Sequence, residues 1–181
     1  MCVALGWVVC LVVPVATRAQ IPPSATLLPP GFTLTVERSF GPASTIIEAT
    51  KPNENFPKPH QDNGIRLAIN WSGIAGAATA LEMTAAAPEA PAQQIPGSVT
   101  RDEPCGKQRY RGGFLACRKI ITPWVGSGNG PDLVTWSINW STATPTGMIS
   151  IAISGFCGAK ETSMAWIDGI IAKLATVSQR D

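Results

Sequence analysis

The segment DLVTWSINWSTATPTGMISIAIS (Asp132–Ser154) carries the two clearest strand patterns of the chain. In each half, large apolar side chains alternate with small residues such as serine; the apolar members are Trp136, Ile138, Trp140, Ile149, Ile151 and Ile153. A period of two predicts strands with one buried face. The short TATPTG connection between the halves favours neighbouring antiparallel strands.

More strands are predicted toward the N-terminus. GFTLTVERSF (31–40) alternates, TIIEAT (45–50) is a plausible antiparallel partner, and IRLAINWS (65–72) alternates again. FLACRKIIT (114–122) is also strand-like, whereas residues 51–64 are dense in Pro, Asn and Asp and indicate a loop. The apolar faces would be formed by Phe32, Leu34, Val36 and Phe40 in the first strand, and by Ile65, Leu67, Ile69 and Trp71 in the third.

Two segments have helical features. In IAGAATALEMTAAAP (74–88) the alanines favour helix, while Thr79, Leu81 and Met83 alternate as in a strand. A strand is slightly favoured there, as the return arm of a hairpin, and a helix stays open. KETSMAWIDGIIAKLATV (160–177) predicts an amphipathic helix with Thr162 or Ser163 as N-cap. Its apolar stripe is Met164, Ile167, Ile170, Ile171 and Leu174.

These elements predict an α+β fold. An antiparallel sheet that is apolar on one side needs a cover, and the C-terminal amphipathic helix is the obvious one. Antiparallel strands, a final strand hairpin and a terminal helix containing IIAKL (170–174) together resemble the PsbP-like fold over residues 32–176. The resemblance implies a non-enzymatic accessory or binding role, and it transfers no functional residues to this chain.

Composition limits the classes of partner. At 181 residues the chain is about the size of one domain. Its residues are 45% hydrophobic and only 14% charged, which argues against a disordered chain. The net charge of +2 is too small to indicate nucleic acid or an anionic membrane as partner.

The N-terminus is typical of an export signal. An apolar run from Cys2 to Ala16 is followed by Thr17, Arg18 and the small residue Ala19, which predicts a signal peptide over residues 1–19 cleaved after Ala19. Residues 20–31 contain two Pro-Pro pairs and predict an extended linker before a single domain over 32–181. Because a spanning helix needs about 20 apolar residues, no stable membrane span is expected after cleavage. The expected location is therefore extracytoplasmic, either periplasmic or secreted.

Export decides how the cysteines are interpreted. Cleavage would leave Cys105, Cys117 and Cys157 in an oxidising compartment. The stretch DEPCGKQRYRGGFLACRK (102–119) places the first two on either side of a Gly112-Gly113 bend, which predicts a hairpin with a Cys105–Cys117 disulfide. Pairings of either cysteine with Cys157 stay open. A leftover thiol would be inert or would link two copies of the chain.

Five residues are candidates for binding. Lys107, Arg109 and Arg111 lie inside the predicted hairpin, and Arg109 and Arg111 would share a face if the backbone is extended there. Two guanidinium groups on one face can bind a carboxylate, a phosphate or a partner protein. The alternative is a solvated loop whose charges protect an edge strand from aggregation. Trp124 and Trp166 are candidates for exposed aromatic side chains, although packing at the rim of the core is the commoner role.

Catalytic and metal-binding patterns are missing from the sequence. His60 is the single histidine, and no GxSxG motif accompanies any serine. CxxC and HxxxH spacings are absent, and GSGNG (126–130) lacks the Lys-Ser/Thr of a phosphate-binding loop. We therefore expect no metal and no cofactor. The leading hypothesis is an exported, non-enzymatic module for an unknown protein or small-molecule partner. The alternatives are a small hydrolase using His60 with a serine or Cys157, and a disulfide-linked structural homodimer.

Overall fold

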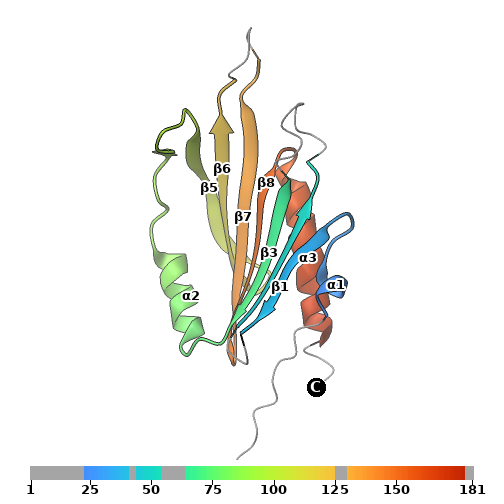
Figure 1. The fold of residues 1–181 in the computed structure, drawn as a ribbon. Helices are drawn as coiled ribbons and strands as arrows, with labels where there is room; N and C mark the ends of the chain where they lie inside the picture. Colours follow the sequence, from blue (N-terminus) through green and yellow to red (C-terminus); the bar gives the residue numbers. More distant parts are fainter. Residues whose placement is uncertain (1–22, 41–43, 54–63, 125–129, 178–181) are drawn as a thin grey trace, which may run out of the picture.

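The computed structural model describes residues 23–40, 44–53, 64–124 and 130–177 (Figure 1). They form an α+β fold with one eight-stranded antiparallel sheet in the order β1-β2-β3-β8-β7-β6-β5-β4. The strands are β1 (Thr33–Ser39), β2 (Ser44–Lys51), β3 (Ile65–Ser72), β4 (Gln93–Gln94), β5 (Arg101–Tyr110), β6 (Gly113–Thr122), β7 (Leu133–Thr144) and β8 (Gly147–Phe156). The helices are α1 (Ser24–Leu27), α2 (Ala77–Ala86) and α3 (Lys160–Val177).

Two of the predictions fall on segments that the structure does not describe. The predicted signal peptide, residues 1–19, and His60 both lie outside the described residues. Among the helices that are described, none is both long and apolar enough to cross a bilayer.

The two faces of the sheet differ in chemistry, as the alternating patterns predict. One face, the apolar face, carries large buried side chains that belong to a single core cluster. Its members on the central strands are Ile65, Leu67, Ile69, Leu115, Cys117, Ile138, Trp140, Ile151 and Ile153. The intervening residues point to the opposite, polar face because successive side chains of a strand alternate. They are Arg66, Ala68, Asn70, Ala116, Arg118, Ser137, Asn139, Ser141, Ser150, Ala152 and Ser154.

Helix α3 spans the residues over which a helix is predicted. Ile167 and Ile170 on this helix are fully buried in the core cluster, and Trp166 packs edge-on against Phe32 and Phe156. The predicted N-cap is wrong. The helix begins at Lys160, so Ser163 lies inside it and is fully buried.

The predicted burial of the first strand is also wrong. Leu34 is 39% exposed and Phe40 is 56% exposed, and only Phe32, just before the strand, is buried. The reason is the position of β1, which is an outer strand that pairs with β2 alone and has an irregular register between Leu34 and Val36. Alternation in the sequence does not distinguish an outer strand from a central one.

The proline-rich segment is not extended throughout. Ser24–Leu27 form the single helical turn α1, and Leu27 is fully buried in the core cluster. Pro23 precedes this turn, a position where a missing N–H costs nothing and a fixed φ is compatible with helix. The expectation of an extended backbone is therefore wrong for the middle of this segment.

Residues 77–86 form helix α2, so the strand favoured for this segment is wrong. A return arm would have to pair with β3, but β3 already has β2 on one side and β8 on the other. The alanine-rich segment then adopts the helix that its composition favours. In Figure 1, α2 lies beside the sheet at the left, and its backbone comes close to those of β7 and β8.

Candidate functional site

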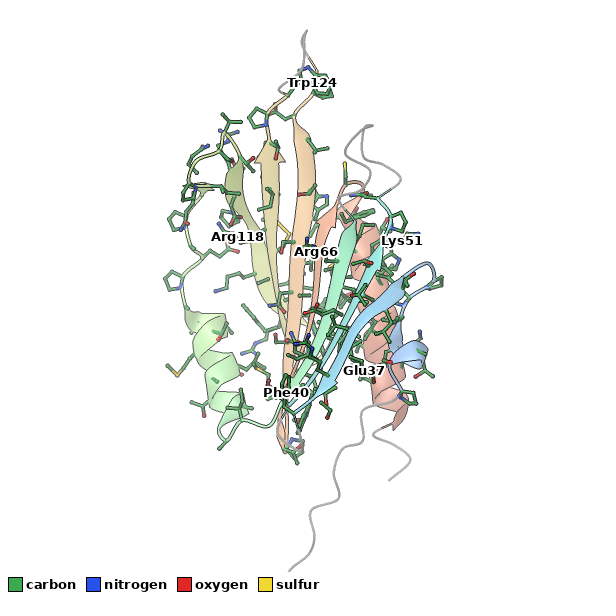
Figure 2. All side chains as sticks on the ribbon, in the orientation of Figure 1. Glu37, Phe40, Lys51, Arg66, Arg118 and Trp124 are labelled. Atoms are coloured by element: carbon green, nitrogen blue, oxygen red, sulfur yellow. A yellow bond between two sulfur atoms is a disulfide. The ribbon has the colours of Figure 1, made fainter. Side chains whose placement is uncertain are left out.

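The polar face contains a row of four residues that lie in register on four neighbouring strands. Arg118 of β6 pairs with Ser137 of β7, which pairs with Ser154 of β8, which pairs with Arg66 of β3. We call these four residues the polar row. At about 4.8 Å per strand, the backbones of its two arginines lie about 14 Å apart. Figure 2 labels both arginines at similar heights in the sheet.

The rows beside it are built from small side chains. Ala116, Asn139, Ala152 and Ala68 form the next row, and most of them carry only a methyl group. In the part of the chain that the structure describes, the guanidinium of Arg66 and the hydroxyls of Ser137 and Ser154 make no hydrogen bond or ion pair. The side chain of Arg66 is exposed. These groups are therefore available to a ligand or to water.

Three basic side chains on the same face contact α2 and the residues after it. Lys107 and Arg109 of β5 pair with Ala116 and Phe114 of β6, so their side chains lie on the face that carries Arg118. We call Lys107, Arg109 and Arg118 the basic cluster.

Lys107 binds the C-terminal end of α2. Its Nζ donates hydrogen bonds to the carbonyl oxygens of Thr84, at 3.1 Å, and Ala87, at 2.6 Å. The end of a helix carries partial negative charge on unpaired carbonyls, and a cation there is stabilising. Since α2 has no basic residue in its own last turn, β5 supplies this charge.

The two arginines of the basic cluster contact other residues of the same segment. Arg109 forms an ion pair with Glu82, and both side chains are largely exposed, at 55% and 65%. The Nε of Arg118 donates to Asp102 Oδ1 at 2.6 Å, and its terminal nitrogens donate to the carbonyls of Ala90 and Pro91. The segment from Ala77 to Pro91, the α2 segment, is thus held to the sheet by polar contacts at several places.

The structure separates the three basic residues that the sequence suggested as one site. β5 ends at Tyr110, and Arg111 lies in the turn with a positive φ of 49°. Its Nε is 3.4 Å from Asp168 of α3, whereas Arg109 contacts α2. Arg109 and Arg111 therefore do not converge on one anion in this arrangement. Binding of an anion by these residues stays a prediction.

The predicted disulfide is present. Cys105 and Cys117 are bonded across β5 and β6, with Cα atoms 5.1 Å apart, and Cys105 lies where the register between these strands shifts. Cys157, at the end of β8, is a free thiol of intermediate exposure. Burial raises its pKa above the usual value, so it is a weaker nucleophile at neutral pH than an ordinary cysteine.

The two candidate aromatic residues have different surroundings. Trp124, two residues after the end of β6, is 46% exposed, and its ring lies so close to Gly130 that a side chain there would collide with it. Trp166 is partly buried and packs against two phenylalanines. Recognition of a partner by either residue stays a prediction.

In the described part of the chain, neither a cluster of metal-ligating side chains nor a similar protein points to a further site. Among the described residues, no group of three or more His, Cys, Asp or Glu side chains is placed to hold a metal ion. No family model, curated protein or solved structure matches this chain. The polar row and the partners of the basic cluster are not apparent in the sequence. The alternating serines of β7 and β8 are a signal for a polar face, but their alignment with Arg66 and Arg118 depends on strand order and register.

Proposed function

We propose that this chain is an exported, non-enzymatic binding or accessory module, and that it holds its partner on the polar face. One observation carries the proposal: a central strand of the sheet presents an exposed arginine beside two serine hydroxyls, and none of the three has a partner among the described residues. A solvated face alone would be ordinary for an antiparallel sheet. The alignment of an unpaired guanidinium with two free hydroxyls is what points to recognition.

The chemistry of the polar row suits an anionic or strongly polar group. A guanidinium binds carboxylate or phosphate through two parallel hydrogen bonds, and hydroxyls can add donors from the side. Small neighbours such as Ala68 and Ala152 leave space above the strands for such a group. Arg66 would provide the charge, and Ser154 and Ser137 would help to orient the bound group.

We further infer that α3 covers the apolar face, which leaves the polar face for binding. The burial of Ile167 and Ile170 in the core cluster supports this inference, and so does the hydrogen bond between Tyr110 of β5 and Asp168 of α3. With the apolar face occupied by the chain itself, a partner has access to the other side of the sheet. The basic cluster and α2 would then form one border of the binding surface.

Site-specific photo-crosslinking in the native host tests the proposal. A photoreactive amino acid replaces Asn139, which is exposed on the polar face, and the matched control replaces Glu161, which is exposed on α3. We expect an adduct from position 139 that is absent from position 161 and is lost when Arg66→Glu is added. Equal adducts from both positions, or none from position 139, would contradict the proposal.

Export and catalysis are tested separately. Mass spectrometry of the protein recovered from the cell envelope or medium should show a chain that begins after Ala19. A full-length chain confined to the cytoplasm would reject export. For the hydrolase alternative, esterase and peptidase turnover should be unmeasurable, and turnover that disappears in His60→Ala would establish an enzyme instead.

A further inference from the structure

We propose that the α2 segment is an internal ligand of the basic cluster, and that an acidic, extended segment of a protein partner takes its place. The inference rests on the proposed function, because it names the kind of partner that the polar face would bind. It explains why three cations on one hairpin all contact one short stretch of chain, Arg118 in addition to its ion pair with Asp102.

The first argument is that the α2 segment is weakly anchored by apolar contacts. In α2 only Ala77 and Leu81 are buried, and Met83 is 69% exposed. The helix has no side-chain N-cap, and residues 86–99 are all exposed. Packing therefore contributes little to holding this segment in place, and its polar contacts with the basic cluster matter correspondingly more.

The second argument is chemical. Every group that the α2 segment offers to the basic cluster is an oxygen acceptor: the carboxylate of Glu82, the carbonyls at the end of α2, and the carbonyls of Ala90 and Pro91. An acidic peptide offers the same acceptors and adds full negative charges. Exposed ion pairs such as Arg109–Glu82 are weak, so a ligand with several carboxylates can compete with a single one.

The third argument is location. Arg118 of β6 belongs both to the basic cluster and to the polar row, so these two groups of residues are adjacent on the polar face. Phe114, which is 6% exposed, lies on the same face, with the Lys107 ammonium 5.3 Å from its ring centre. When the α2 segment leaves, Lys107 and Arg109 lose these partners and become free to bind a ligand. One extended acidic chain could then contact the basic cluster and continue to Arg66.

The experiment uses the mature, oxidised protein and a fluorescent oligoglutamate peptide, with an oligoserine peptide as control. Glu82→Gln removes the internal carboxylate, and Glu89→Gln is the matched control because Glu89 is exposed and has no partner in the described structure. We expect Glu82→Gln to bind oligoglutamate about two- to five-fold more tightly than the unaltered protein, and Glu89→Gln to bind it equally.

A second pair of variants tests the basic cluster. Lys107→Gln combined with Arg109→Gln should weaken oligoglutamate binding about tenfold or more, since both positive charges are lost. Arg101→Gln is the matched control, because Arg101 lies on the same strand but pairs with Glu103 and not with α2. Amide hydrogen exchange of residues 77–87 should become faster when the peptide is bound, which a merely structural role for α2 would not produce.

Several outcomes would overturn the inference, and they differ from failure of the proposed function. Peptide binding with unchanged exchange in α2 would show that nothing is displaced. Equal affinities of Glu82→Gln and Glu89→Gln for oligoglutamate would show that Glu82 does not compete with the peptide for the basic cluster. The absence of binding in all variants would reject an acidic partner. Each result leaves crosslinking at Asn139 as a separate measurement of whether the polar face binds anything.

Discussion

The hydroxyl of Tyr110 lies 2.8 Å from both carboxylate oxygens of Asp168, so the last residue of β5 is bonded to the middle of α3. The same tyrosine accepts a hydrogen bond at its carbonyl from the indole of Trp140, at 2.8 Å. One residue therefore connects the disulfide-linked hairpin, a central strand and the C-terminal helix. The basic cluster is carried by that hairpin, so its position depends in part on this connection.

Replacement of Tyr110 by phenylalanine tests the connection. Phe retains the ring and removes the hydrogen bond to a charged acceptor, which should lower the free energy of unfolding by about 1 kcal/mol because the pair is only partly buried. Urea unfolding of the variant and of the unaltered protein measures the difference. If Asp168→Asn lowers stability in Tyr110→Phe as much as it does in the unaltered protein, the two residues are not energetically coupled.

The same contact predicts a pH dependence. Burial, followed by the hydrogen bond to Asp168, raises the pKa of Tyr110 above its usual 10.0, with Arg111 acting in the opposite direction. The folded state holds the tyrosine proton more tightly than the unfolded state does. The resulting contribution to stability is fully present below pH 10, and this contribution is lost as the pH rises through the raised pKa. Because the chain has one tyrosine, ultraviolet titration of the folded protein should show tyrosinate forming at a higher pH than in urea. A coincident titration in both states would contradict the contact.

The sequence predicts best the elements in which one side is buried along their whole length. β3 and α3 have the predicted bounds because strict alternation and a helical stripe each correspond to continuous burial on one side. β1 alternates equally well but is an outer strand. The segment of α2 is ambiguous because its alanines favour helix while Thr79, Leu81 and Met83 alternate as in a strand. The choice depends on the pairing of β8 with β3, a contact between residues far apart in the sequence.

The candidate site depends even more on long-range pairing. The serines of β7 and β8 are predictable as the polar side of two strands. Their alignment with Arg66 follows from strand order, which local patterns do not contain. The disulfide was predictable since its cysteines lie on either side of a glycine bend. The partners of Lys107 and Arg109 are not predictable, because α2 lies more than 20 residues away in the sequence and no local pattern places it beside β5.

Removal of the Cys105–Cys117 disulfide should destabilise the protein without changing the strand order. The bond joins residues 12 apart in sequence, and a loop of this size stabilises by about 3 kcal/mol in the chain-entropy description. The double variant Cys105→Ala with Cys117→Ala should therefore unfold at a lower urea concentration. Cys157→Ala serves as the control. A double variant as stable as that control would show that the bond contributes nothing to stability.

Cys157 should react slowly with thiol reagents. Burial raises its pKa, so at neutral pH less of it is thiolate than in an unfolded chain. The rate of alkylation, followed by mass spectrometry, should reach its half-maximum at a higher pH in the folded protein than in urea. Non-reducing electrophoresis should show a monomer. A dimer band that disappears in Cys157→Ala would instead favour the disulfide-linked homodimer.

Two glycines should respond to alanine in opposite directions. A Cβ at Gly147, the first residue of β8, would lie 2.1 Å from the backbone oxygen of Ser72, so Gly147→Ala must displace backbone and should lower the free energy of unfolding by about 2 kcal/mol. A Cβ at Gly169 in α3 meets no atom within 4 Å, and alanine there should raise the free energy of unfolding by about 0.5–1 kcal/mol through helix propensity. Urea midpoints of both variants, compared with the unaltered protein, measure the two effects. Destabilisation by Gly169→Ala would mean that a side chain at this position of α3 meets other atoms.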